Sequence, residues 1–184
     1  MQFPELTTPT LHLKEILPRS RNDIYEIFSE PDVTKYYDLE AFTDPCQSDE
    51  LILLFSNRYS QNSGIRWGIY PKTQDKCIGT CGFNSWSKPM RSATIGYELN
   101  KNYWGKGIIT EALSAIIQLA FTGRLACGII NRIQADTVLG NIASEKVLQK
   151  LGFVEEGTRR QSGYWKGQYH DLKCFGLLKD EFKT

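Results

Sequence analysis

The chain has 184 residues and nearly balanced charge, with 22 basic against 21 acidic side chains and a formal net charge of +1. This balance gives no electrostatic reason to expect nucleic acid or an anionic membrane as a partner. No apolar run approaches the ~20 residues of a membrane span, and the first residues lack the features of a signal peptide, so we expect the cytoplasm. The length suits one domain, which we expect over residues 1–184.

Five cysteines are scattered along the chain, an odd number without regular spacing, which argues against a disulfide framework. Cys77 and Cys81 lie four residues apart in a strand-like run, so we expect two buried free thiols on one face. The chain has only two histidines, so we expect no metal site.

The amino-terminal part predicts one strand and then two helices. Apolar and polar residues alternate over 10–16, which is typical of a strand. Ser20 and Asp23 then precede apolar residues at helical spacing and indicate a capping-box-like helix start, with Asp in the place of Glu or Gln. Residues 31–45 read as irregular and rich in aromatic side chains, and helical spacing returns over 48–59.

The middle of the chain predicts three strands, at 65–70, 76–86 and 93–99, which short turns join into an antiparallel meander. A helix from about 107 to 122, a strand over 132–139 and a second helix from 140–141 to 151 follow. Gly152 is a natural residue to end that helix. The last segment predicts a hairpin of two strands, 153–164 and 169–178.

The strand, helix and strand over 93–139 require a crossover connection, which makes the two strands parallel and the crossover right-handed. The other neighbouring strands are joined by short turns. We therefore expect an α/β (α+β) fold with a mixed, mostly antiparallel sheet of about seven strands, flanking helices and a central βαβ unit.

The segment Tyr-Trp-Gly-Lys-Gly-Ile-Ile-Thr-Glu-Ala, residues 103–112, follows a strand and leads directly into a helix. Gly105 and Gly107 let the backbone turn tightly and approach a ligand, and the helix start offers unpaired N–H groups. Together they predict a pyrophosphate cradle made of backbone, although a plain strand–helix turn has the same pattern. The segment is neither a P-loop nor a dinucleotide fingerprint, which needs glycine where Thr110 stands.

Six blocks, two of them within this motif, share one pattern: Ile-Gly-Tyr-Glu-Leu at 95–99, Tyr-Trp-Gly-Lys-Gly at 103–107, Thr-Glu-Ala at 110–112, Asn-Arg-Ile at 131–133, Asn-x-Ala-Ser-x-Lys-Val-Leu-x-Lys-Leu-Gly-Phe at 141–153 and Tyr-Trp-x-x-x-Tyr at 164–169. With these blocks the chain resembles the GNAT acetyltransferase superfamily, and within it the RimJ/RimL-like branch of ribosomal-protein N-terminal acetyltransferases. The resemblance covers about residues 10–180 and implies the GNAT fold. Asn102 departs from the family's usual Arg or Gln, which leaves the backbone cradle intact.

The resemblance implies an N-acetyltransferase that moves an acetyl group from acetyl-CoA to a primary amine. It places the pantetheine arm between two splayed strands, bonded by the backbone of Tyr97 and Leu99, with an amide near Leu99 polarising the thioester carbonyl. Asn141 either contacts the arm or serves as a helix N-cap. The coenzyme-binding residues implied are Tyr97, Leu99, Trp104, Gly105, Lys106, Gly107, Ile108, Ile109, Thr110 and Asn141.

Two side chains are candidates for catalysis. Ser144, one turn after Asn141, protonates the departing thiolate by resemblance, although a helix serine can equally be solvated or bonded to the backbone. Glu98 is the candidate general base because it ends a strand beside the expected thioester; the alternatives are a solvated or ion-paired carboxylate with a water relay. We expect Glu111 to be structural and to hold its helix in place.

The acceptor site has aromatic candidates: Tyr36, Tyr37, Trp165 and Tyr169 either line a substrate cleft or are ordinary core residues. The acceptor implied by the branch is a protein N-terminal amine. A small amine such as an antibiotic, polyamine or amino acid is an alternative, and so is a non-catalytic acyl-CoA-binding sensor. The resemblance also implies a homodimer.

Overall fold

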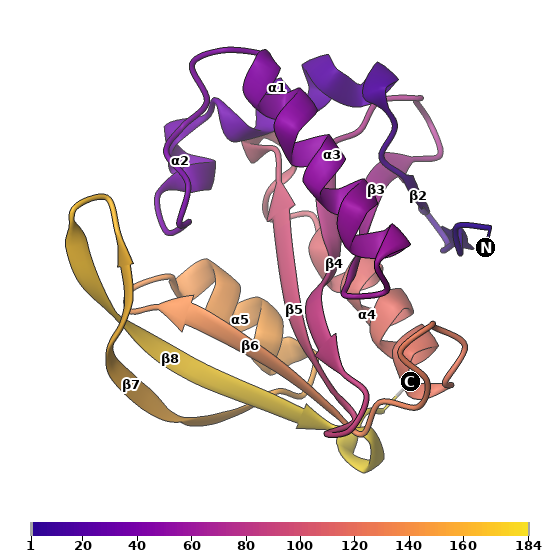
Figure 1. Ribbon diagram of the computed structural model, residues 1–184, viewed down its shortest axis with the longest axis vertical. Helices are drawn as coiled ribbons and strands as arrows, with labels where there is room; N and C mark the ends of the chain where they lie inside the picture. The colour runs from indigo at the N-terminus through magenta and orange to yellow at the C-terminus, as the bar shows by residue number, and fades with distance from the viewer. Residues whose placement is uncertain (1, 184) are drawn as a thin grey trace.

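The computed structural model describes residues 2–183, and in them eight strands form one mixed sheet (Figure 1). The strand order is β1-β2-β3-β4-β5-β6-β8-β7. The strands are β1 (Leu6–Thr7), β2 (Leu11–Glu15), β3 (Ile65–Pro71), β4 (Gly79–Ser87), β5 (Ser92–Leu99), β6 (Arg132–Val138), β7 (Val154–Trp165) and β8 (Gln168–Leu178). All neighbours are antiparallel except β5 and β6, which confirms the expected sheet and its βαβ unit, with β1 as an additional short strand.

The part of the chain that the structure describes has five α-helices, four of which cover the two faces of the sheet. They are α1 (Arg21–Phe28), α2 (Pro31–Thr34), α3 (Cys46–Ser60), α4 (Ile108–Phe121) and α5 (Ile142–Lys150). Figure 1 shows α1 and α3 over one face of β3, β4 and β5, and α4 and α5 behind the opposite face. The short helix α2 lies in the segment that the sequence predicted to be irregular.

Two apolar clusters hold these layers together. In the larger one, α4 inserts Leu113 and Ile116 against sheet residues such as Trp67 and Phe83, all of them buried. The smaller cluster joins α1 and α3 to the sheet and includes Phe28 and Phe55. Because burial of apolar surface is the main favourable term in folding, these two clusters fix where the loops at the ends of β5 and β6 lie.

The start of α1 corrects part of the prediction. Ser20 is the N-cap position, as expected, but its side chain makes no cap bond and instead contacts the Tyr70 hydroxyl at 2.8 Å. Asp23 accepts a bond from the backbone N–H of Cys77 at 2.9 Å, so the capping-box interpretation was wrong.

The cysteines are all free thiols, as predicted. Cys77, however, precedes β4 and packs in the α1–α3 cluster, whereas Cys81 belongs to the larger cluster. The expectation that both thiols share one face of one strand was therefore wrong. Burial raises the pKa of each of these two thiols to about 12, so both are inert as nucleophiles at neutral pH.

The two parallel strands separate soon after they meet. The pairing of β5 with β6 runs only from Ser92 opposite Arg132 to Thr94 opposite Gln134. Beyond that point Figure 1 shows the strands diverging into a V, with α2 and the end of the β7–β8 hairpin on either side of its mouth. The later residues of β5 therefore face a gap that no neighbouring strand fills.

Candidate active site

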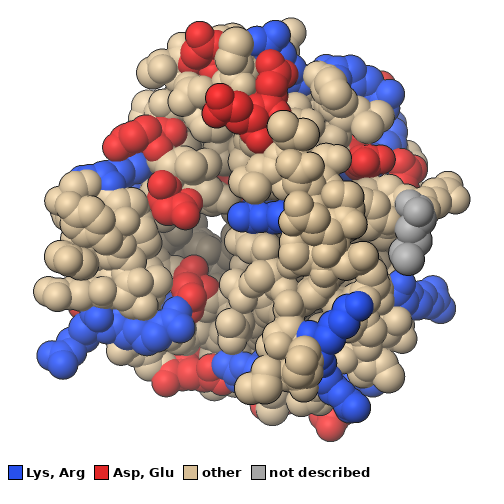
Figure 2. Space-filling model, in the orientation of Figure 1, with Lys and Arg blue, Asp and Glu red and all other residues tan. Residues whose placement is uncertain are grey.

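A cavity of about 620 Å³ lies at the mouth of this V, a volume that suits a cofactor or small ligand. Its walls come from α2 and the loop after it, the end of β5, the β5–α4 loop and one side of α5. Figure 2 shows an opening through this part of the molecule, with acidic and basic side chains around it. The lining residues are Asp32, Val33, Lys35, Tyr36, Tyr37, Tyr97, Glu98, Leu99, Tyr103, Trp104, Gly105, Lys106, Gly107, Ile108, Ile109, Thr110, Asn141, Ala143, Ser144, Lys146, Val147 and Lys150.

The β5–α4 loop forms one end of the cavity with its backbone. Gly105 and Gly107 have φ of 73° and 76°, a left-handed conformation that other residues adopt only at a cost. A Cβ at either position would meet no atom within 4 Å, so the loop needs these glycines for their backbone angles and not for space.

The start of α4 leaves its first amides without helical partners beside the cavity. Gly107 is the N-cap residue and makes no side-chain cap bond, and the first helical bond runs from Glu111 N–H to Gly107 O at 3.0 Å. The N–H groups of residues 108–110 therefore have no intrahelical acceptor. Because these three residues line the cavity, their amides and the positive end of the helix dipole form an anion cradle.

Lysine side chains add positive charge around the cradle. Lys146 and Lys150 lie one turn apart on α5 and line the cavity. Lys106 folds back along its own loop, where its ammonium donates to Asn102 O at 2.9 Å and lies 5.3 Å from the centre of the Tyr103 ring. Positive charge at this end of the cavity favours a phosphorylated ligand.

The end of β5 offers unpaired backbone groups to the gap. Asn100 N–H bonds Ile78 O of the β4 side at 2.8 Å. Because successive residues of a strand point their N–H and C=O groups to opposite sides, those of Tyr97 and Leu99 point toward the separated β6. The Leu99 carbonyl accepts a bond from the Trp104 indole at 2.7 Å, which leaves the Leu99 N–H and both groups of Tyr97 for a ligand.

Asn141 and Ser144 face the cavity from α5, next to the phenol of Tyr97. The Asn141 side-chain oxygen caps α5 by accepting Ser144 N–H at 3.3 Å, so the N-cap role is present and its amino group remains for a ligand. The Tyr97 hydroxyl lies 2.6 Å from Ser144 Oγ and also reaches Ser144 O at 3.2 Å. Ser144 is therefore bonded to a β5 side chain, an arrangement that spacing along the chain did not predict.

Glu98 points to the opposite face of β5 from Tyr97, where it is almost fully buried. Arg66 Nη2 of β3 donates to both carboxylate oxygens, and Thr80 donates its hydroxyl to one of them. Burial alone would lower the pKa of Arg66, but the Glu98 charge raises it above its ordinary value, so the guanidinium stays charged. The sequence left open whether Glu98 is ion-paired, and in the structure it is paired with Arg66.

Further contacts hold the Arg66 guanidinium in this buried cluster. Its Nε donates to Thr80 Oγ1 at 2.9 Å, its Nη1 donates to Asn84 Oδ1 at 2.7 Å, and its guanidinium lies 5.3 Å from the centre of the Phe55 ring. Sequence reasoning missed Arg66. The available signal was a charged residue inside the apolar run of a central strand, which is rare unless the charge is paired.

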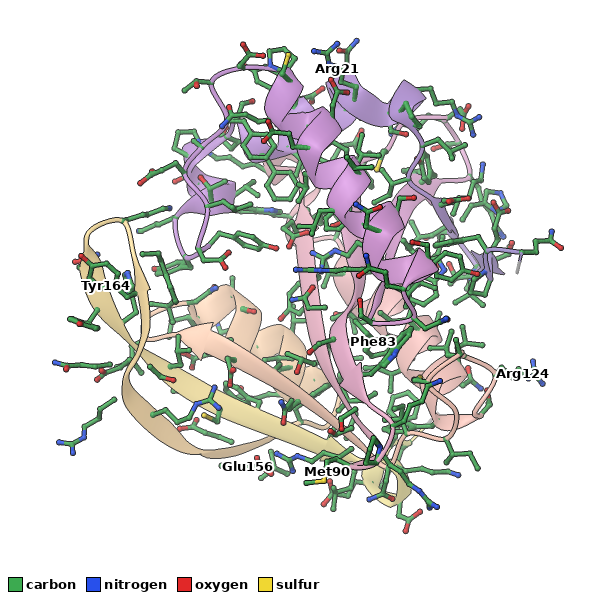
Figure 3. The ribbon with its side chains drawn as sticks, viewed as in Figure 1. Arg21, Phe83, Met90, Arg124, Glu156 and Tyr164 are labelled. Carbon is green, nitrogen blue, oxygen red and sulfur yellow. The ribbon has the colours of Figure 1, made fainter. Side chains whose placement is uncertain are left out.

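The aromatic residues predicted for the acceptor site divide into two groups. Tyr36 and Tyr37 line the cavity, and burial together with the Glu98 charge raises the pKa of Tyr37. Trp165 instead stacks on His170, with ring centres 4.3 Å apart. Tyr169 is largely exposed and packs against Tyr164 on the β7–β8 hairpin, which Figure 3 shows at the side of the molecule away from β4. The structure does not bring these two hairpin residues into the cavity.

Two hydrogen bonds nevertheless join α2 and the loop after it to the opposite side of the V, one to the β7–β8 hairpin and one to the β6–α5 loop. Lys166 at the hairpin turn donates to Thr34 O at 2.7 Å, and the Tyr36 hydroxyl donates to Gly140 O at 3.0 Å. They close the cavity between the segment after α1 and the carboxyl end of β6. Sequence reasoning missed Lys166 because a turn lysine has no pattern that indicates a distant acceptor.

Glu111 lies beside the cradle and has a structural role, as expected. Its carboxylate accepts bonds from Thr8 Oγ1 at 2.5 Å and from the Thr10 N–H and hydroxyl at 2.8 Å each. These contacts tie the first turn of α4 to the β1–β2 connection. In the part of the chain that the structure describes, no group of three or more His, Cys, Asp or Glu side chains is placed to hold a metal ion. None of the helices in residues 2–183 is long and apolar enough to cross a membrane.

Comparison with known proteins agrees with this geometry. YoaA of Bacillus subtilis (strain 168), an uncharacterized N-acetyltransferase, is 35% identical over 177 residues, which are 96% of this chain and 98% of that protein. The ribosomal-protein-serine acetyltransferase of Escherichia coli (strain K12) is 32% identical over 108 residues, 58% of each protein. The microcin C7 self-immunity acetyltransferase MccE, solved with acetyl-CoA and AMP, matches 92% of this chain and 93% of its own at 21% identity, with a TM-score of 0.83, which supports the fold.

The family model described as "Acetyltransferase (GNAT) domain" matches residues 10–154, most of the chain, and covers β5, the cradle and α5. The resemblance read from the sequence is thereby confirmed, since the match includes the Gly105–Gly107 loop and the Asn141–Ser144 pair. This protein belongs to the GNAT family of acetyltransferases.

Proposed function

We propose that this protein transfers an acetyl group from acetyl-CoA to the α-amino group at the N-terminus of a protein or peptide. The observation that carries the proposal is the set of open amides at residues 108–110, which face the gap between β5 and β6. Acetyl-CoA, when bound, supplies the acetyl group as a thioester. The chain fits that group because the cradle, the unpaired strand edge and the lysines of α5 line one cavity.

The binding roles follow from where each group points. The amides of 108–110 hold the diphosphate, and Lys146 and Lys150 add charge next to it. Tyr97 and the Leu99 N–H bond the pantetheine arm as a neighbouring strand would, and the Asn141 amino group reaches the same arm. The Leu99 N–H then lies where it can polarise the thioester carbonyl.

The acceptor amine must lose its proton, and the surroundings of Glu98 limit how this happens. Both Glu98 oxygens are engaged by Arg66, so we propose that a water relay takes the proton and that the ion pair fixes the charge beside it. At pH 7 roughly a tenth of α-amines, with pKa about 8, are neutral, against about four in ten thousand lysine-like amines with pKa about 10.4. A site with no free strong base therefore favours an α-amine over a polyamine.

The comparison with the ribosomal-protein-serine acetyltransferase supports a protein acceptor, since that name describes acetylation of a protein. The cavity mouth between α2 and the β7–β8 hairpin lies on the acceptor side of β5, and Tyr36 and Tyr37 line it.

The test is acceptor-dependent thiol release from acetyl-CoA. A panel of peptides with free N-termini is compared with polyamines, aminoglycosides and free amino acids, and each peptide has a matched version with a blocked N-terminus. We expect release with free peptides and none with blocked ones. Turnover on small amines alone would favour the small-amine alternative, and coenzyme binding without turnover on any acceptor would favour the sensor.

A further inference from the structure

Tyr97 reaches Ser144 across the gap between β5 and α5. Its side chain is half-buried, and its hydroxyl is within hydrogen-bonding distance of two atoms of Ser144, the hydroxyl Oγ at 2.6 Å and the carbonyl O at 3.2 Å. Both residues line the cavity, on the side of β5 that faces the coenzyme and not on the side of the Arg66–Glu98 pair.

Hydrogen-bond chemistry allows this contact several arrangements, and the two in which Tyr97 donates to Ser144 differ in what they leave for a ligand. A carbonyl oxygen accepts and never donates, and a phenol carries one hydrogen. If Tyr97 donates to Ser144 O, the serine hydroxyl donates back to the phenol oxygen and has no hydrogen left for a ligand. If Tyr97 donates to Ser144 Oγ, the serine hydrogen is free to point into the cavity.

We propose that Tyr97 is a positioning residue for the reaction, because its hydroxyl directs the Ser144 hydrogen toward the sulfur that leaves the acetyl group. This inference rests on the proposed function. When negative charge develops on the sulfur, Ser144 donates to it and Tyr97 donates to Ser144, so the two bonds form a chain in which each strengthens the other.

The pKa values of the phenol and of the thiol determine whether a proton moves along this pair of hydrogen bonds. Burial raises the pKa of Tyr97 to about 12. The hydrogen bond with Ser144 acts in the opposite direction, and the Glu98 charge adds to the increase. A free thiol has a pKa of about 8.5, so the thiolate does not take a proton from this phenol. The C–N bond forms, the C–S bond breaks, the sulfur leaves with the electron pair, and the surplus proton of the amine goes to water. Ser144 thus stabilises the thiolate by hydrogen bonding, in place of the proton donation that the resemblance implied.

The experiment measures the thiolate directly. Free coenzyme A is bound to the wild type and to Tyr97→Phe, Ser144→Ala and the double variant, and the ultraviolet absorbance of the thiolate is followed against pH. We expect Tyr97→Phe to raise the pKa of the bound thiol by about one unit, because Ser144 without its phenol partner donates a weaker and less well directed bond to the thiolate. We expect the double variant to match Ser144→Ala, because Tyr97 acts through Ser144.

Kinetics and a matched control complete the test. Tyr97→Phe is expected to lower kcat about tenfold with an unchanged KM for acetyl-CoA. Tyr59→Phe also removes one phenol bond, to Gln2 O at 3.0 Å, and is expected to change neither quantity. Ser144→Thr keeps a hydroxyl and is expected to retain the low thiol pKa.

Two outcomes separate the possible failures. If coenzyme A does not bind to the folded wild type, the proposed function itself is refuted. If it binds but the thiol pKa is the same in Tyr97→Phe, or if Tyr97→Phe keeps its full effect in the Ser144→Ala background, the positioning role is wrong and the proposed function stands.

Discussion

Arg66 of β3 and Glu98 of β5 form a buried ion pair that crosses over the intervening strand β4. Gly96 of β5 leaves room for the pair, and Thr80 of β4 is bonded to it. A Cβ on Gly96 would lie 2.9 Å from Arg66 Nη1 and 2.7 Å from Asn84 Nδ2, and Thr80 bonds both members of the pair. The pair therefore connects three strands beneath the side of the cavity that we propose to hold the acceptor.

Glu98→Gln leaves a buried guanidinium without its counter-charge, so we expect about 3 kcal/mol of destabilisation in denaturant unfolding. The double variant Arg66→Met with Glu98→Met removes both charges and is expected to recover most of that loss. If the pair is structural, the folded double variant keeps kcat within about tenfold of the wild type. A loss of about a hundredfold or more would instead identify Glu98 as the general base.

The fold was largely predictable because its signals are local. Short turns between 65–70, 76–86 and 93–99 required antiparallel pairing, and the helix between 93–99 and 132–139 required a parallel crossover. The separation of β5 from β6 after Thr94 was known only by family resemblance, since the number of paired residues depends on tertiary packing.

The sequence predicted the part of the candidate site that is formed by backbone groups better than the part that is formed by side chains. Gly105 and Gly107 adopt positive φ, a conformation that the residue type itself indicates. The partner of Glu98 lies 32 residues earlier, and no spacing rule connects such positions. The sequence could not tell whether the hairpin aromatics reach the cavity, because β7 contains register irregularities at 155–157 and 159–163 and alternation does not give the face of a strand across such irregularities.

Gly107→Ala is expected to weaken coenzyme A binding about tenfold, because alanine disfavours the positive φ and the cradle amides shift when the loop relaxes. Calorimetric titration measures the change. Gly128→Ala is the matched control, since Gly128 has φ of 78° and equally open space but lies outside the cavity lining. Both variants are expected to lose about 1 kcal/mol of stability. Equal effects of the two on binding would contradict the cradle.

The Glu111 carboxylate makes the free energy of unfolding depend on pH. Burial alone would raise its pKa, but the bonds from Thr8 and Thr10 lower it below the ordinary value of 4.5. The lowered pKa means that this contribution is fully present above the unfolded pKa and is lost as pH falls through the folded pKa. In urea unfolding at a series of pH values, we expect wild type to lose stability below about pH 4.5 more steeply than Glu111→Gln. Parallel pH profiles would show that the carboxylate contributes nothing.

Tyr36 and Lys166 donate to Gly140 O and Thr34 O across the end of the cavity that we propose to hold the acceptor. Tyr36→Phe and Lys166→Met each remove one of these bonds, so we expect each to raise the KM for a peptide acceptor severalfold, with a larger rise in the double variant. The KM for acetyl-CoA is expected to stay unchanged because the cradle at 108–110 is untouched. Steady-state kinetics with one substrate varied at a time measures both constants. If the KM for acetyl-CoA rises instead while that for the peptide is constant, these bonds serve the coenzyme end of the cavity, and the acceptor must enter elsewhere.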